Sequence, residues 1–180
     1  MKQTEDFLLS GNKHHFIEII AIIDKSRQIF QVVIMSSLGL TCWTGDLAGA
    51  RKAIDRGEDV NDKDGVFDQT PLMWAVTHQH NSIVKLLLEQ PTLDLNLTDS
   101  NGMTALNFAA YNGNVEGIKL LLADPRLNTH NLEDADGDTP LMTAIVVANV
   151  DVLRELVAHP SVDLNTKVLG RRLERVASWI

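Results

Sequence analysis

The chain has very little cysteine, proline or aromatic residue. Of its 180 residues, one is cysteine and five are proline, and the aromatic residues make up 5%. A single thiol cannot close a disulfide within the chain, which excludes the disulfide-rich class of secreted domains. We expect Cys42 to be a small buried side chain, and we expect the protein to work in a reducing compartment, the cytoplasm.

Basic charge is also scarce. The chain has 16 lysines and arginines against 24 aspartates and glutamates, a net charge of −8. An acidic chain is repelled by phosphate backbones and anionic membranes, so no nucleic-acid partner is expected. The exception is a basic cluster near the C-terminus, which we interpret as a solvated face and which contains Lys167, Arg171, Arg172 and Arg175.

No apolar run is long enough to span a membrane. The most apolar segment, residues 16–23, is too short for a bilayer and is followed by Asp24, Lys25 and Arg27. Acidic residues also precede it, which disfavours a signal peptide. No membrane span is therefore expected.

Motifs for catalysis or metal binding are missing as well. The chain has no His-Glu-x-x-His, no phosphate-binding glycine loop and no Gly-x-Ser-x-Gly. Residues 134–138 imitate the start of a calcium loop, but Thr139 and Ile145 stand where that loop needs glycine and glutamate. His78 and His80 are two residues apart, which predicts that they point to different sides of a helix. No enzymatic activity, metal, cofactor or small-molecule substrate is expected.

What the chain does contain is an internal repeat. The segment Asp68-Gln-Thr-Pro-Leu-Met-Trp-Ala75 recurs in related form at residues 101–109 and 137–144. The three threonines in these copies are 34 and 35 residues apart, a period typical of stacked two-helix units. The second half of each period also recurs, at residues 83–96, 117–130 and 152–165, with an earlier copy at 45–61.

Each repeated residue type has a local role in such a unit. Thr70 and Thr139 are expected to cap a first helix, and the prolines that follow them suit its first position. Val84, Leu87 and Leu88 have the spacing of an amphipathic second helix. Positive φ angles are predicted where the chain turns, at Gly57, Asp68, Gly102 and Gly137.

These residues resemble the ankyrin repeat, with its Thr-Pro-Leu-His start, paired alanines, glycine turn, Val-x-x-Leu-Leu helix and closing Asp-Val-Asn. The resemblance covers roughly residues 36–170. It implies an all-α solenoid of helix-turn-helix repeats joined by β-hairpin-like loops. The expected repeats are residues 36–69, 70–103, 104–138 and 139–169, between an N-terminal helical cap or degenerate repeat at 1–35 and a C-terminal capping helix at 170–180.

The N-terminal cap rests on an alignment of residues 11–20 with residues 113–122. It places Phe16, Ile19 and Ile20 at the core positions of a second helix. Residues 28–35 suit either a helix or a strand.

Two departures from the family pattern affect contacts between repeats. Met73, Asn107 and Met142 replace the usual histidine, so its hydrogen bonds are expected to be missing or replaced. His130 stands where the alignment puts the closing asparagine of one copy.

The resemblance implies a non-enzymatic module that binds a protein partner through its hairpin tips and the concave surface of its inner helices. Trp43, Phe67 and Tyr111 are predicted to be aromatic anchors of this surface. The full set of predicted contact residues is Trp43, Thr44, Phe67, Gln69, Thr77, His78, Met103, Tyr111, Asn112, Asp138, Val146 and Val147.

Two alternatives stay open at this point. The chain could be the recognition domain of a larger or secreted protein, such as a bacterial effector delivered into a host cell, with its activity elsewhere. It could also be an enzyme whose site has no recognisable motif.

Overall fold

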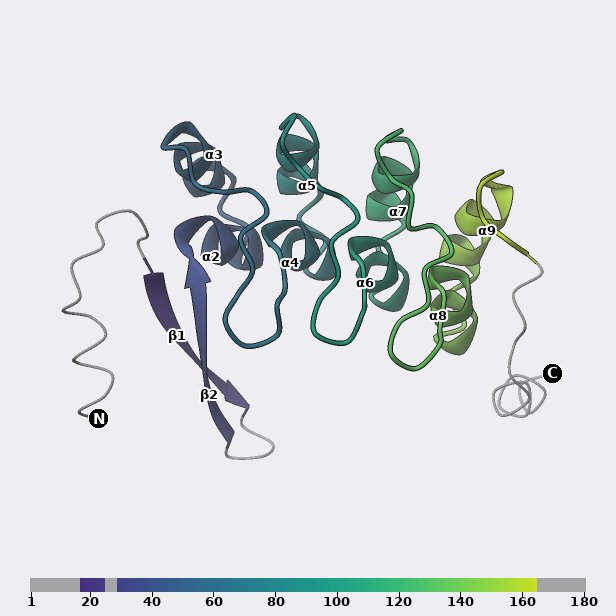
Figure 1. Cartoon of the computed structure of the whole chain (residues 1–180), viewed down its shortest axis with the longest axis horizontal. Helices are drawn as coiled ribbons and strands as arrows, with labels where there is room; N and C mark the ends of the chain where they lie inside the picture. The colour runs from purple at the N-terminus through teal and green to yellow at the C-terminus, as the bar shows by residue number, and fades with distance from the viewer. Residues whose placement is uncertain (1–16, 25–28, 165–180) are drawn as a thin grey trace.

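The computed structural model describes residues 17–24 and 29–164, and in this part of the chain the helices form two rows (Figure 1). The inner row contains α2 (Ser37–Thr44), α4 (Pro71–Thr77), α6 (Ala105–Tyr111) and α8 (Pro140–Val146). The outer row contains α3 (Leu47–Asp55), α5 (Asn81–Leu88), α7 (Val115–Leu122) and α9 (Val150–Ala158). Each inner helix packs against the next inner helix and against the outer helix that follows it. The prediction of a helical repeat solenoid is confirmed.

Hydroxyl caps start every inner helix. The Oγ atoms of Thr70, Thr104 and Thr139 each accept the backbone N–H three residues ahead, at 3.3 Å. Ser36 does the same for α2, at 3.2 Å. Pro71 and Pro140 occupy the first helical position, where a backbone N–H has no partner within the helix. The predicted helix starts at Thr70 and Thr139 are therefore confirmed.

We expect Thr139→Val to lower the free energy of unfolding by about 1 kcal/mol, because valine keeps the shape of threonine but leaves the Met142 N–H without its cap. Chemical denaturation measures the change. Thr139→Ser is the matched control, since it keeps the hydroxyl. A Thr139→Val protein as stable as the Thr139→Ser protein would show that the cap is unimportant.

Positive φ angles occur at all four predicted turn positions, with values of 81° at Gly57, 59° at Asp68, 75° at Gly102 and 80° at Gly137. A further set joins each inner helix to its outer helix, and it contains Gly45, Gln79, Gly113 and Ala148. Two members of this second set carry a Cβ atom, which the left-handed region disfavours.

Ala148 has φ 55° and is exposed, so its methyl group adds strain without filling core space. Ala148→Gly is expected to raise the free energy of unfolding by about 0.5–1 kcal/mol, the balance of relieved strain against the extra freedom of glycine. Thermal and chemical denaturation would detect this gain. An unchanged or lower stability would show that the backbone at Ala148 is not strained.

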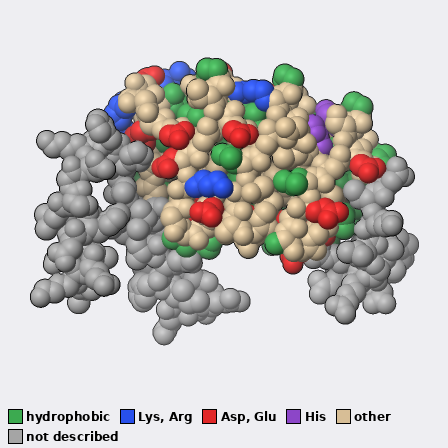
Figure 2. All heavy atoms as spheres, in the orientation of Figure 1, with side chains coloured by type: hydrophobic (Ala, Val, Ile, Leu, Met, Phe, Trp, Pro, Cys, Tyr) green, Lys and Arg blue, Asp and Glu red, His purple; other side chains and the backbone are tan. Residues whose placement is uncertain are grey.

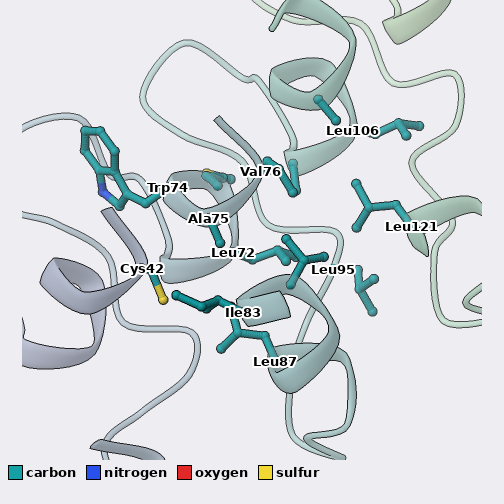
Figure 3. Packing of buried hydrophobic residues seen from close by; sticks show 14 of the residues in the cluster. Cys42, Leu72, Trp74, Ala75, Val76, Ile83, Leu87, Leu95, Leu106 and Leu121 are labelled. Carbon is teal, nitrogen blue, oxygen red and sulfur yellow. The ribbon is translucent and has the colours of Figure 1, made fainter. Parts of the chain in front are cut away.

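The core lies between the two rows of helices (Figure 3). Leu72, Ala75 and Leu106 from the inner row are fully buried, as are Leu87 and Leu121 from the outer row. Small residues on the inner helices let the outer helices approach closely. The chain's one cysteine, Cys42, is also fully buried, and burial raises the pKa of its thiol, so its predicted role as a small core residue is confirmed.

A ladder of asparagines joins the loops that follow the outer helices. Asn61, Asn96 and Asn131 each donate through Nδ2 to a backbone carbonyl of the next repeat, at 2.8, 2.9 and 2.8 Å. Each also accepts a backbone N–H from that repeat through Oδ1. The alignment of His130 with this position is therefore wrong: Asn131 occupies it, because this copy is one residue longer.

Asn107 also makes hydrogen bonds in place of the histidine that is usual at this position in the family. Its Oδ1 accepts the N–H of Thr104 at 3.1 Å, and its Nδ2 donates to the Asp138 carbonyl of the next repeat at 3.5 Å. At Asn107, a hydrogen bond between repeats is thus replaced.

The N-terminal segment differs from its prediction. Residues 17–24 form strand β1 (Ile17–Asp24), which pairs antiparallel with β2 (Ile29–Ser36) and places Ile17 opposite Ser36. The prediction that Ile19 and Ile20 occupy core positions of a helix is wrong, because both segments are rich in β-branched residues, which favour extended backbone when a partner strand lies beside them. For residues 29–35, the extended alternative is the one observed. Ser36 ends β2 and caps α2.

The remaining terminal predictions lie outside the described residues. They are the position of Phe16, the capping helix at 170–180, and the basic cluster around Lys167 and Arg171.

Candidate partner-binding surface

The inner-helix surface is defined here by two sets of residues. The first set is the last turn of each inner helix together with its C-cap, and the second is the tips of the hairpin loops at residues 66–69, 100–103 and 135–138. In Figure 1 these loops project below the inner row, away from the outer helices. All the predicted contact residues belong to one set or the other.

Each hairpin tip is held by backbone hydrogen bonds. Asp64, Asp99 and Asp134 donate their N–H groups to the carbonyls of Gln69, Met103 and Asp138, at 2.9, 2.9 and 3.0 Å. Neighbouring tips are also joined: the Ser100 N–H donates to the Phe67 carbonyl at 2.9 Å, and the Ala135 N–H donates to the Asn101 carbonyl at 2.8 Å. The predicted hairpin-like loops are confirmed, and they form one continuous edge.

Aspartate side chains stabilise the same tips from inside. Asp64 Oδ1 accepts the N–H groups of Val66 and Phe67, at 2.9 and 2.6 Å. Asp134 Oδ1 accepts those of Asp136 and Asp138, at 3.0 and 2.9 Å. Residues 134–138, whose sequence imitates the start of a calcium loop, therefore form a turn that the Asp134 side chain stabilises.

Two tryptophans and two histidines form a cluster where the first two repeats meet. The His78 ring stacks on the Trp74 ring at a centroid distance of 6.0 Å and an interplanar angle of 9°. The Trp43 ring meets His78 edge-on at 6.1 Å. The His80 ring also stacks with the His78 ring at a centroid distance of 6.0 Å, and its Nε2 lies 3.2 Å from the Trp43 carbonyl oxygen. The cluster fixes the end of α2 against the end of α4.

The prediction that His78 and His80 point to different sides of a helix is wrong. It assumed that both residues are helical, but α4 ends at Thr77 and the chain turns at Gln79, where φ is 58°. The turn brings the two rings together. Among the described residues, no group of three or more histidine, cysteine, aspartate or glutamate side chains is arranged to hold a metal ion.

Protonation of His78 is disfavoured in the folded protein. Burial, and after it the nearby His80, lowers the pKa of His78 below its ordinary value of 6.5. A histidine with a lowered folded pKa contributes stability at neutral pH, and this stability is lost as the pH falls below about 6.5. His130 behaves alike, because burial and His159 lower its pKa.

We therefore expect the thermal midpoint to fall between about pH 7.5 and pH 5.5, and to fall less in His78→Gln than in the wild type. The effect of His78 alone is small, since its side chain is partly exposed. Calorimetry at the two pH values measures it. An equal drop in both proteins would show that His78 does not contribute.

The predicted contact residues differ widely in exposure. Tyr111 is 61% exposed and Val146 is 46% exposed, while Thr44 and His78 are also exposed. The half-buried ones are Trp43, Phe67, Gln69, Thr77, Met103, Asn112 and Val147. Asp138 is buried, with 8% exposure, so the prediction that its side chain faces a partner does not fit this position. The reason is that Asp138 closes the base of its hairpin.

Two members of the cluster were not among the predicted contact residues. Trp74 is buried and its ring stacks with His78, and its Nε1 donates to Asp64 Oδ2 at 3.3 Å. His80 packs over Gly45 of the preceding repeat. The repeat period is the sequence signal for this contact, because it aligns His80 with the residue that follows Gly45 in the preceding repeat.

None of the helices that the structure describes has the length and hydrophobicity needed to cross a lipid bilayer.

Comparison with known proteins gives a consistent match. The family model described as ankyrin repeats in three copies matches residues 38–131 and 93–168. Inversin of Danio rerio is 38% identical over 64 residues, which are 35% of this chain and 6% of that protein. The zinc finger CCCH domain-containing protein 24 of Oryza sativa subsp. japonica is 37% identical over 91 residues, covering 43% and 12%. A probable E3 ubiquitin-protein ligase of the same plant, XBOS33, is 40% identical over 74 residues, covering 39% and 14%. The chain thus spans only a small part of each of these relatives.

Proposed function

The chain belongs to the ankyrin-repeat family, and we propose that it is a non-enzymatic module that binds a protein partner on its inner-helix surface. Ankyrin repeats are generally protein–protein interaction modules. The partner contacts the last turns of the inner helices and the hairpin tips, and the outer helices serve as scaffold. The buried Cys42 fits a reducing compartment, and we propose a cytoplasmic location.

The observation that carries the proposal is the exposure of large side chains at equivalent positions. Tyr111 and Val146 each occupy the last position of an inner helix, 35 residues apart, and both are exposed. Thr77 is half-buried at the last position of α4, and Trp43, which aligns with it by the repeat period, is half-buried one residue before the end of α2. Tyr111 and Val146 contribute little to the core because most of each side chain is exposed or half-exposed, whereas Trp43 also packs against the core. Aromatic residues at such positions are typical of interface anchors.

A second proposal concerns the protein as a whole. The matched segments of inversin, the zinc finger protein and the probable ubiquitin ligase are short parts of long proteins. The alternative role for this chain is therefore that of a recognition domain in a longer protein whose activity lies elsewhere. It would bind its protein partner through the same inner-helix surface.

Affinity capture with quantitative mass spectrometry tests the proposed surface. The bait is the full chain, compared with Trp43→Ala/Tyr111→Ala. The matched control is Val150→Ala/Val157→Ala, which changes two exposed side chains of the outer helix α9. We expect the inner-surface variant to lose specific partners that the control keeps, with both variants folded by circular dichroism. Equal capture by the wild type and both variants would overturn the proposed surface.

A further inference from the structure

Within residues 35–164, basic side chains lie almost entirely on one side of the solenoid. Between residues 35 and 164 the chain has 19 acidic and 8 basic side chains. Seven of the basic ones belong to outer helices or the turns after them: Arg51, Lys52, Arg56, Lys85, Lys119, Arg126 and Arg154. The eighth, Lys63, precedes the first hairpin tip, where its Nζ donates to the Thr98 carbonyl at 2.6 Å.

On the outer side, several of these basic side chains form ion pairs with acidic side chains of the same chain. Lys85 pairs with Glu116 at 3.1 Å, and Lys119 pairs with Glu155 at 3.4 Å, each joining neighbouring outer helices. Arg126 pairs with Asp124 at 2.7 Å. Much of the negative charge on this side is therefore balanced by charge from the chain itself.

The inner-helix surface combines acidic tips with an uncharged row. The four inner helices contain no charged residue. Exposed carboxylates stand at the hairpin tips, at Asp68 and Asp136, and neither forms an ion pair within the described residues. Figure 2 shows lysine and arginine side chains mainly along the upper edge, over the outer helices, with a further basic patch in the middle of this face. Acidic side chains occur at the upper edge as well and across the middle and lower part.

We infer that the occupant of the inner-helix surface is an extended, basic segment of a partner protein. Lysine or arginine side chains of that segment face the carboxylates of Asp68 and Asp136. Of the eight basic side chains in residues 35–164, Lys63 alone lies on this side of the solenoid. Cations also bind over the exposed faces of aromatic rings such as Tyr111. A second copy of this chain is a poor occupant, because it carries the same net charge of −8. The inference rests on the proposed function and adds the chemistry of the partner.

Selection from a phage-displayed library of random peptides, about a dozen residues long, tests this directly. The full chain is the target, and Trp43→Ala/Tyr111→Ala is the counter-target. We expect the enriched peptides to be net positive. Their synthetic forms should lose about tenfold in affinity between about 50 and 300 mM NaCl, because salt screens charge pairs.

Charge-neutralising variants give the second measurement. Asp68→Asn/Asp136→Asn is expected to weaken the selected peptides by about three- to tenfold, because two exposed charge pairs are lost. The matched control is Asp55→Asn/Glu89→Gln, which removes the same charge from exposed positions at the ends of α3 and α5. It should leave the affinity unchanged.

The possible results separate the two proposals. Enriched peptides that need Trp43 and Tyr111 but are neutral or acidic overturn the basic partner and leave the proposed surface standing. An equal effect of the two charge variants also overturns the basic partner, since net charge alone would then explain the affinity. Peptides that bind the counter-target as well as the wild type, or no enrichment, overturn the surface itself.

Discussion

Gly45→Ala is expected to lower the free energy of unfolding by about 3 kcal/mol, more than any other single change proposed for the scaffold. Gly45 has φ 83°, where an L side chain costs about 1–2 kcal/mol. A Cβ atom there also lies 2.6 Å from the His80 ring. The ring must move, which breaks its contact with the Trp43 carbonyl and its stack on His78. Urea denaturation measures the loss.

Gly57→Ala separates the two causes. Gly57 has φ 81°, but a Cβ atom placed on it meets nothing within 4 Å, so it reports the backbone cost alone. We expect a loss of about 1 kcal/mol there. Adding His80→Ala to Gly45→Ala should recover part of the lost stability. Equal losses at Gly45 and Gly57 would show that the contact with His80 has no energetic weight.

Tyr111→Ala is expected to weaken partner binding by about 2 kcal/mol, or roughly 30-fold, without a comparable loss of stability. Tyr111 ends α6 with most of its side chain in solvent, so the folded chain alone gains little from the ring. An interface that covers it gains both its apolar area and its ring face. Isothermal titration calorimetry with a purified partner or a selected peptide gives the affinity.

Tyr111→Phe is the matched variant, because it keeps the ring and removes the hydroxyl. An affinity near that of the wild type assigns the effect to the ring. Trp43→Ala alone is a less clean test of the surface, since Trp43 also packs against His78 and its loss removes a contact between the first two repeats. A Tyr111→Ala protein that binds like the wild type would remove Tyr111 from the surface.

Sequence reasoning succeeded where a local rule decides the structure. The spacing of Thr70, Thr104 and Thr139 gave the period, and the hydroxyl caps and positive φ angles followed from residue type. These features depend on a few neighbouring residues. They recur in each repeat, so one copy supports the interpretation of the next.

It failed where a contact depends on how the chain turns between elements. His78 and His80 stack because the helix stops before them, which helical spacing alone does not reveal. Asn131 takes the ladder position because one copy is a residue longer, so the alignment on His130 was one position off. The β1–β2 pairing depends on two segments meeting, whereas the alignment considered each segment alone.

Hydrogen–deuterium exchange on the full chain, with and without a saturating partner or selected peptide, tests the binding surface most directly. We expect protection at the ends of α2, α4, α6 and α8 and at the hairpin tips around residues 66–69, 100–103 and 135–138. Exchange in α3, α5, α7 and α9 should stay unchanged. Protection confined to the outer helices would show that the partner does not bind the inner-helix surface.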